Sequence, residues 1–388
     1  MKLLRNKTVQ SLLSSLICIV FGVLIGYIVL LIINAEGASK AMVTILKNFF
    51  VYPNAKMRME YFGTALVKMA PLLMCSLSVL FAYKTGLFNI GAAGQYCIGV
   101  CACLFTALYL QWSWPLCLLS AVAAGAFFGF IVGVLKSYRN VNEVISGIML
   151  NWIALYITNA VLSLVKEPSS PYTYKLQGAR GKAALLPQLG PINELFNNNK
   201  YITIAVPIAI GIAILIWVVL EKTKFGYELK ATGFNRNAAK YCGMAEKRNA
   251  ILTLVISGAL AGLGASFYYQ SGIEQWECTA TSVPGMGFNG IAATFLGGLN
   301  PIGTIFSSYF LQHIKEGGTH IDTMKYSAQI SDLISSVIIY LCGFVLFIKY
   351  VMNKITVKKE EKKKKTPQTE PPIKTEIPVE ATKKGGDQ

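Results

Sequence analysis

Charged residues and histidine are scarce in this sequence. Only 14% of its residues are charged, against roughly 25% in soluble proteins, and His313 and His320 are its only histidines. They lie too far apart for an H-E-x-x-H zinc motif, and no G-x-x-x-x-G-K-[ST] segment for a Walker-type ATP site occurs. Most of the nine cysteines fall inside apolar runs, where cysteine is ordinary small filler. The sequence therefore predicts a protein that is not an enzyme and that uses no metal or cofactor.

Long stretches contain no Asp, Glu, Lys or Arg at all. These charge-free runs are residues 11–33, 88–110, 112–135, 144–165, 201–220 and 249–273. Crossing the apolar part of a bilayer takes about 20 such residues, and at that length only a helix satisfies its own backbone hydrogen bonds there. We therefore predict an all-α, polytopic membrane protein. The first run is longer than the apolar part of a signal peptide, so we expect it to remain as an uncleaved helix.

Four further ranges complete the predicted bundle. Residues 62–83 and 327–348 contain one charge each, Lys68 and Asp332, which we expect near the ends of their helices. Residues 284–299 and 301–314 are short and flank a Gly-Gly-Leu-Asn-Pro break, so we expect tilted or partly re-entrant helices. The total is about ten spans in a transmembrane domain of residues 1–353. An even number places both termini on one side, and the distribution of Lys and Arg weakly favours the cytoplasm.

The chain ends in a polar tail, residues 354–388, that is rich in Lys, Glu, Thr and Pro. Such a composition buries too little apolar surface to fold, so we predict a disordered cytoplasmic segment. Its lysines supply much of the formal net charge of +17. Basic clusters beside a membrane are attracted to anionic lipids, so membrane lipid, and not nucleic acid, is the expected partner of this charge. A solvated tail without a specific partner is the simpler interpretation.

Two loops stand out by their length. Residues 166–200 form the longest loop on the predicted outer side and are the natural face for an extracellular receptor. Residues 221–248 form the longest predicted cytoplasmic loop before the tail and include a short amphipathic stretch, 236–241. In that stretch Ala238, Ala239 and Tyr241 would form a compact apolar patch beside basic residues, suited to a groove on another protein. A solvated basic loop is the alternative.

Small residues at helical spacing predict close contacts between helices. They are Gly125, Gly129 and Gly133 in the run 112–135, Gly258 and Gly262 in the run 249–273, and Gly91 and Gly94 in the stretch 86–95.

Uncharged amides are the main polar groups inside the predicted spans. Asn89 and Gln95 lie in the stretch 86–95, and Asn151 lies beside Trp152, whose ring could stack on a planar solute. Amides both donate and accept hydrogen bonds, which suits sugar hydroxyls and base edges, although bonds between helices are an equal alternative. Glu143 stands at the start of the run that contains Asn151. Ion-coupled transporters usually bury ionisable residues deep in the bundle, so this pattern favours a neutral polar solute and an outside energy source.

Four blocks of the sequence, in order, resemble the inner-membrane permeases of ABC importers in the ribose and branched-chain amino acid superfamily. The blocks are residues 86–95 (Gly-Leu-Phe-Asn-Ile-Gly-Ala-Ala-Gly-Gln), 142–151, 226–244 and 289–301. The blocks are spread over most of residues 60–345, and the resemblance is closest to the nucleoside and simple-sugar branch. Two positions depart from the family pattern, because Ala93 and Asn289 stand where an acidic residue is commoner.

The resemblance implies a fold like the ten-span permeases of the ribose and cobalamin importers, in the bacterial cytoplasmic membrane with both termini cytoplasmic. It also implies three protein partners: a second related permease subunit, an ATPase subunit that hydrolyses ATP, and an extracellular substrate-binding lipoprotein. The block 226–244 resembles the family's ATPase-coupling segment. Its candidate coupling residues are Gly226, Leu229, Ala231, Thr232, Gly233, Asn235, Ala238, Ala239 and Gly243. The implied function is ATP-driven import of nucleosides, with simple sugars such as ribose or galactose as the second prediction.

Two other classes of protein compete with this interpretation. An ion-coupled secondary transporter would work without an ATPase, and sodium coupling through carbonyls and hydroxyls leaves no charged signature. A membrane enzyme or scaffold is disfavoured because no catalytic set is present. The sequence leaves open the exact solute, the choice between homodimer and heterodimer, and which amides contact the solute.

Overall fold

Helices make up nearly all the regular structure of this chain. The computed structural model describes residues 7–178, 180–322, 326, 329–345, 347–348, 350–351 and 354. Within those residues there is no β-strand, only isolated bridges such as Lys166–Thr173 and Gln188–Thr203 in the loops. The predicted all-α fold is confirmed. The predicted tail, 354–388, lies outside the described residues apart from Lys354.

Each predicted apolar range contains a helix. These helices are α1 (Lys7–Ile33), α3 (Ala55–Lys84), α4 (Ala92–Leu108), α5 (Trp114–Arg139), α6 (Glu143–Leu162), α8 (Ala205–Lys222), α11 (Glu246–Tyr269), α12 (Met286–Leu296), α13 (Pro301–Gly318) and α14 (Gln329–Cys342). Within the described residues, 6 helices are long and apolar enough to cross a membrane: α1, α3, α5, α6, α8 and α11. The predicted total of about ten spans stays a prediction.

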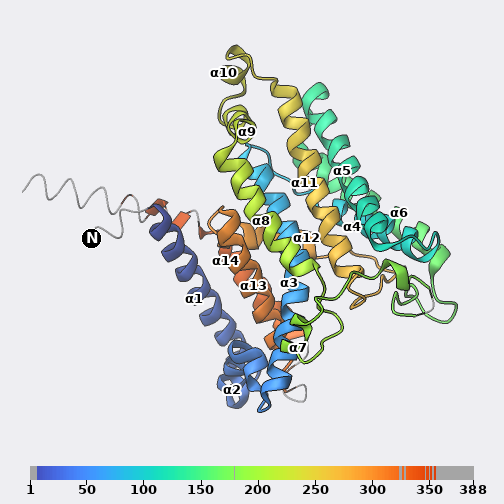
Figure 1. Ribbon diagram of the computed structural model, residues 1–388. Helices are drawn as coiled ribbons and strands as arrows, with labels where there is room; N and C mark the ends of the chain where they lie inside the picture. Colours follow the sequence, from blue (N-terminus) through green and yellow to red (C-terminus); the bar gives the residue numbers. More distant parts are fainter. Residues whose placement is uncertain are drawn as a thin grey trace, which may run out of the picture.

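Short helices connect the long ones. They are α2 (Ala35–Lys47), the 3₁₀ turns η2 (Asn48–Val51), η3 (Ser163–Val165) and η4 (Lys182–Ala184), and α7 (Ile192–Leu195), α9 (Lys224–Phe234) and α10 (Arg236–Tyr241). In Figure 1, α9 and α10 project from one end of the bundle, whereas α2 and α7 lie at the other. We call these the α10 end and the α2 end.

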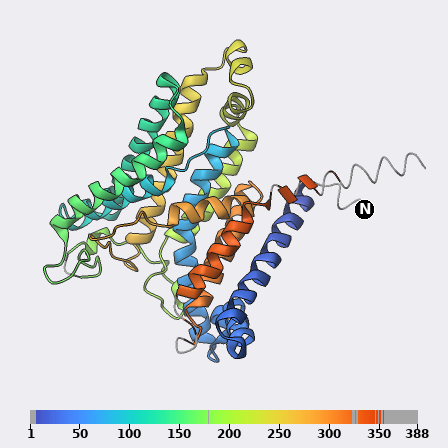
Figure 2. The ribbon, with the colours of Figure 1, turned by 180° about the vertical axis from the view of Figure 1, so that it is seen from behind.

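Asparagines set the starts of several helices. The side chain of Asn142 accepts a hydrogen bond from Val144 N at 2.8 Å at the start of α6, and that of Asn300 accepts one from Ile302 N at 2.9 Å at the start of α13. Both residues belong to the sequence blocks described above, and both act here as N-caps that satisfy otherwise unpaired backbone amides. The break before Pro301 separates α13 from α12, which runs across the bundle in Figure 2.

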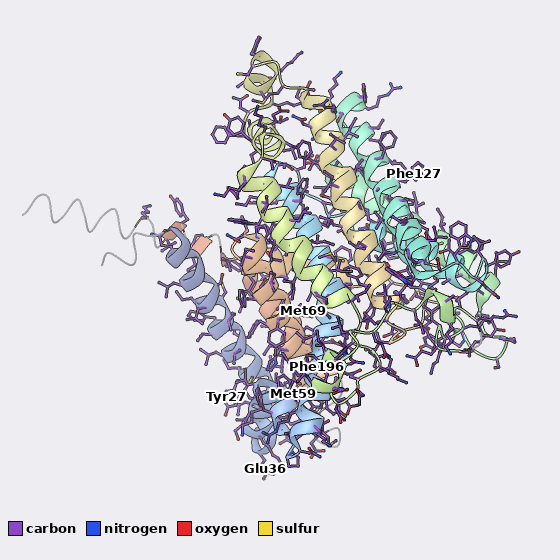
Figure 3. The ribbon with its side chains drawn as sticks, in the orientation of Figure 1. Tyr27, Glu36, Met59, Met69, Phe127 and Phe196 are labelled. Carbon is purple, nitrogen blue, oxygen red and sulfur yellow. The ribbon has the colours of Figure 1, made fainter. Side chains whose placement is uncertain are left out.

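The bundle is enclosed at its centre and apolar at its surface. In the most apolar stretch of α3, 89% of the residues are buried, against 22% in α1. Large apolar side chains cover the outside: Phe127 on α5 is 59% exposed and points away from the bundle in Figure 3, whereas Met69 on α3 is 2% exposed. So much exposed apolar surface is typical of a protein that sits in lipid.

Helices α5 and α11 approach each other through glycines. A β-carbon on Gly125 would overlap the carbonyl of Gly258, and a β-carbon on Gly258 would overlap the carbonyl of Gly125. Farther toward the α10 end, a β-carbon on Gly129 would overlap the carbonyl of Leu254. Backbones therefore pack directly on each other, as small residues allow in membrane helices. Gly133 and Gly262 lie in the same seam, against Ile251 and Ala121.

Candidate translocation and coupling sites

The stretch 86–95 connects α3 to α4 and carries a buried amide pair. The side chain of Asn89, 2% exposed, donates to Ser78 Oγ at 3.0 Å and to Gln95 Oε1 at 2.7 Å. The Nε2 of Gln95 is buried and makes no hydrogen bond within the described residues. A buried unpaired donor is costly, so this nitrogen remains available to a further partner.

Asn151 fastens α6 to the same stretch. Its Oδ1 accepts from the backbone N of Gly94 at 2.7 Å, and its Nδ2 donates to the carbonyl of Ile90 at 3.1 Å. Gly94 permits this approach, because a β-carbon there would lie 2.6 Å from the Cα of Asn151. Gly91 similarly packs against Gly147 of α6. The structure thus brings Asn89, Gln95 and Asn151 into one buried region, where both ends of the Asn151 amide bind backbone.

The other two residues predicted for the pathway lie elsewhere. Trp152 is 44% exposed on the outward face of α6, while its neighbour Asn151 is 3% exposed. Glu143, the first residue of α6, forms an ion pair with Lys136 at 2.8 Å and lines a cavity of about 220 Å³ toward the α10 end. Neither side chain takes part in the hydrogen bonds that join the amides.

Helix α9 is fixed to the bundle through its predicted coupling residues. Leu229 is 1% exposed, and a β-carbon on Gly226 would overlap the carbonyl of Val219 in α8. Thr232 Oγ1 accepts from Asn249 Nδ2 of α11 at 2.9 Å. Beyond it, Arg236 pairs with Glu246 at 2.6 Å. These contacts fasten α9 to α8 and α11.

Gly233, at the last turn of α9, packs directly on the stretch 86–95. A β-carbon on Gly233 would overlap the backbone of Thr85, and Gly86 has a φ of +78°, which favours glycine. Asn89 follows three residues later. The contact therefore joins α9 by backbone alone to the segment that carries the buried amides.

Asn235 links α9 to α10. It ends α9, and its side chain accepts a hydrogen bond from Ala238 N at 3.0 Å at the start of α10. Ala239 is 4% exposed and packs inward, whereas Ala238 is exposed and Ala231 is half-buried. Gly243 follows α10 with a φ of +80°.

Comparison with known proteins identifies the family. Residues 61–343 match the family described as branched-chain amino acid transport system / permease component. The chain belongs to this family. It is a multi-pass protein of the cell membrane, and the predicted resemblance is confirmed. No solved structure matches this permease.

The relatives of this permease are named for different solutes. It is 31% identical to the guanosine ABC transporter permease protein NupP of Bacillus subtilis, over 91% of this chain and 99% of the relative. It is 30% identical to the nucleoside ABC transporter permease protein NupB of Lactococcus lactis, over 93% and 99% respectively. The glucose ABC transporter permease protein TsgB13 of Haloferax volcanii is 29% identical over 74% of this chain and 77% of the relative.

Two aromatic side chains of the permease protrude at its α10 end. Phe234 is 95% exposed and Tyr241 is 93% exposed. The spacing predicts an apolar patch that includes Tyr241, whereas no sequence pattern assigns a role to Phe234. Large exposed aromatics on short helices are typical anchors of protein–protein contacts.

An ion pair inside the permease was not predicted. Lys68 is the fourteenth residue of α3, which begins at Ala55, so it lies about 20 Å along the helix from that end. The expectation that Lys68 lies near a helix end was therefore wrong. Its Nζ binds Glu316 Oε1 of α13 at 2.8 Å. No local pattern could have paired residues that are 248 positions apart.

The α2 end of the permease is held by side chains. The loop 166–200 folds back on α11, where Gln270 Nε2 donates to Ala184 O at 2.8 Å. Nearby the ring of Tyr52 stacks on that of Tyr61 at 4.4 Å, and His320 meets both rings edge-on. Burial lowers the pKa of His320 below its usual value, although Glu316 acts in the opposite direction. Burial, with help from Tyr61, raises the pKa of Tyr52 to about 12.

Proposed function

We propose that this chain is the transmembrane permease subunit of an ATP-driven ABC importer that carries nucleosides across the cell membrane. The observation that carries the proposal is the match to two nucleoside-transport permeases over 91% and 93% of this chain. Simple sugars are the second candidate, supported by the glucose relative and by the galactose/methyl galactoside import permease protein MglC of Haemophilus influenzae.

The importer we propose contains three further kinds of subunit. An ATPase subunit would bind at α9 and α10, where Phe234 and Tyr241 offer anchors. The names of two relatives support a second permease subunit. Bacillus subtilis has two proteins named as guanosine ABC transporter permeases, NupP and NupQ, and both match this chain. We therefore favour a heterodimer of related permeases. An extracellular substrate-binding lipoprotein would dock on the loop 166–200 at the α2 end.

In the proposed topology the α10 end is cytoplasmic. About ten helices, including the short α12 and α13, would form the membrane domain 1–353, as in the permeases of the ribose and cobalamin importers. Both termini would be cytoplasmic, with the disordered tail 354–388 along the anionic leaflet.

The proposed mechanism runs through the backbone contact of Gly233. When ATP closes the ATPase subunits, α10 and α9 would move as one body. Because Gly233 abuts Thr85 and Gly86, this movement would displace the stretch 86–95 and the buried amides. We assign Gln95, through its unpaired Nε2, and Asn89 to the solute pathway. Asn151 would position that stretch, Glu143 with Lys136 would stabilise the α10 end, and the exposed Trp152 would meet lipid or the second permease.

The deciding experiment is uptake by the complete importer in liposomes. A labelled nucleoside should accumulate inside only with ATP and all subunits, and the receptor protein should bind nucleosides more tightly than sugars. A receptor that binds sugars alone would move the assignment to simple sugars. ATP-independent uptake by this chain alone would instead identify a secondary transporter.

A further inference from the structure

The cluster around Glu316 is the most polar region inside the bundle that the mechanism above does not use. The side chains of Lys68 and Glu316 are 26% and 15% exposed. Gln312, one turn before Glu316, is 5% exposed, and its Nε2 also binds Glu316 Oε1, at 2.8 Å. Ionisable groups inside a membrane bundle are costly, so they generally mark a pathway or a binding site.

The two oxygens of Glu316 are used unequally. Both Lys68 and Gln312 bind Oε1, and within the described part of the chain Oε2 accepts no hydrogen bond. A carboxylate oxygen that remains unpaired and partly exposed is a strong acceptor for hydroxyl groups. A purely structural ion pair would gain from satisfying both oxygens, since each unmet acceptor in a low-dielectric setting is unfavourable.

The cluster joins two helices, because Lys68 belongs to α3 whereas Gln312 and Glu316 belong to α13. Figure 2 shows α3 and α13 side by side. The carboxylate of Glu316 and its lysine partner thus come from two different helices.

We propose that Glu316, with Lys68 and Gln312, is a contact site for the ribose of a nucleoside in transit. This inference rests on the proposed function. Glu316 Oε2 accepts hydrogen bonds from the neighbouring 2′- and 3′-hydroxyls, while Lys68 and Gln312 bind Oε1. The site discriminates solutes by their hydroxyl groups, because a solute without them leaves the carboxylate unpaired.

The test compares a ribonucleoside with its 2′-deoxy analogue in the complete importer in liposomes. In Glu316→Gln we expect uptake of the ribonucleoside to fall roughly tenfold, the loss associated with a hydrogen bond to a charged group, while uptake of the deoxy analogue changes little. The affinity of the unaltered receptor protein for both solutes is measured alongside, so that a change in preference is assigned to the permease. An equal fall for both solutes would overturn the proposal.

Charge exchange separates solute contact from a structural role. The double variant Lys68→Glu/Glu316→Lys keeps an ion pair between α3 and α13, so folding should be retained while the preference for the ribonucleoside is lost. Recovery of the wild-type preference would show that the pair only holds helices. The matched control is Lys315→Gln, which removes the exposed pair of Lys315 with Asp332, 3.5 Å apart, from the adjacent position of α13 and should leave the preference unchanged. If the wild-type importer carries sugars only, the proposed function fails, whereas ribose against 2-deoxyribose still tests the site.

Discussion

Two sets of helix contacts in this permease are made by different means, although each end of the bundle contains contacts of both kinds. Toward the α10 end, α5 meets α11, and α9 meets the stretch 86–95, through glycines that bring backbones into contact. Toward the α2 end, α3 meets α13 through an ion pair, and the rings of Tyr52, Tyr61 and His320 pack together. Backbone contacts have no rotamers to adjust, whereas polar and aromatic side chains can exchange partners. The glycine contacts are therefore suited to transmit a displacement, and the side-chain contacts are suited to exchange partners.

The strongest way to break this contrast is to add bulk to the α5–α11 seam. Gly258→Leu would drive a side chain into the carbonyl of Gly125. We expect the free energy of unfolding to fall by about 3 kcal/mol or more, so that little or no monodisperse protein is obtained. Yield and melting temperature in detergent measure the effect. The control is Gly211→Ala in α8, where no atom lies within 4 Å of an added β-carbon and stability should be unchanged or slightly higher. Normal yield of Gly258→Leu would show that the seam is plastic.

A second variant tests the transmitting contact. Gly233→Val would push α9 away from Thr85 and Gly86 while every buried amide residue stays unsubstituted. Because the bundle itself stays packed, we expect folding to survive and ATP-driven uptake to fall at least about tenfold, with ATP hydrolysis continuing. The ratio of solute moved to ATP hydrolysed, compared with that of Gly211→Ala, reports the loss. An unchanged ratio would remove this contact from the mechanism.

A third variant addresses the exposed anchors. Phe234→Ala should weaken binding of the ATPase subunit by about 2 kcal/mol, because truncation of a central aromatic usually costs this much. The stability of the permease itself should not change in this variant, since Phe234 is 95% exposed. A binding titration with the purified ATPase subunit measures the first quantity, and a melting curve measures the second. Phe127→Ala, on a lipid-facing surface, serves as the control.

The smallest expected effect concerns pH at the α2 end. His320 has a lowered pKa in the fold, so its neutral form is favoured there relative to the unfolded chain. This preference for the neutral form contributes fully to the stability of the fold above pH 6.5, the ordinary pKa of histidine. The contribution is lost as the pH falls below 6.5 and through the lower pKa that His320 has in the fold. Melting temperature should therefore decline modestly between pH 7.5 and 5, and His320→Gln should flatten that decline. A flat wild-type profile would contradict the assignment.

The sequence alone predicts the helices well and their contacts poorly. Apolar runs with no charge or a single charge locate every long helix, because burial in lipid leaves few alternatives for such segments. Gly125 and Gly258 can be recognised as packing residues from their spacing, yet only the structure pairs them. Spacing also does not predict that the Oδ1 and Nδ2 of Asn151 bind the backbone of Gly94 and Ile90, since those hydrogen bonds depend on how closely α6 approaches α4.

Two features escaped sequence reasoning for opposite reasons. Lys68 looked like a terminal residue because the apolar run around it starts at Phe62, whereas α3 begins at Ala55 and places it deep in the helix. Phe234 looked like an ordinary apolar residue, which would be buried in most proteins. Its exposure follows from its place at the last turn of α9, beyond the bundle, a position that periodicity does not reveal.

The helices α9 and α10 meet at a single residue, Asn235. Asn235 both ends α9 and begins α10, so the two helices share one cap residue and no linker separates them. A single residue inserted within α10 would turn Tyr241 by about 100° about the axis of that helix, relative to the residues before the insertion. Such an insertion is expected to change which motor subunit this transporter accepts while the rest of the molecule keeps its shape, which offers a short evolutionary route to a new pairing.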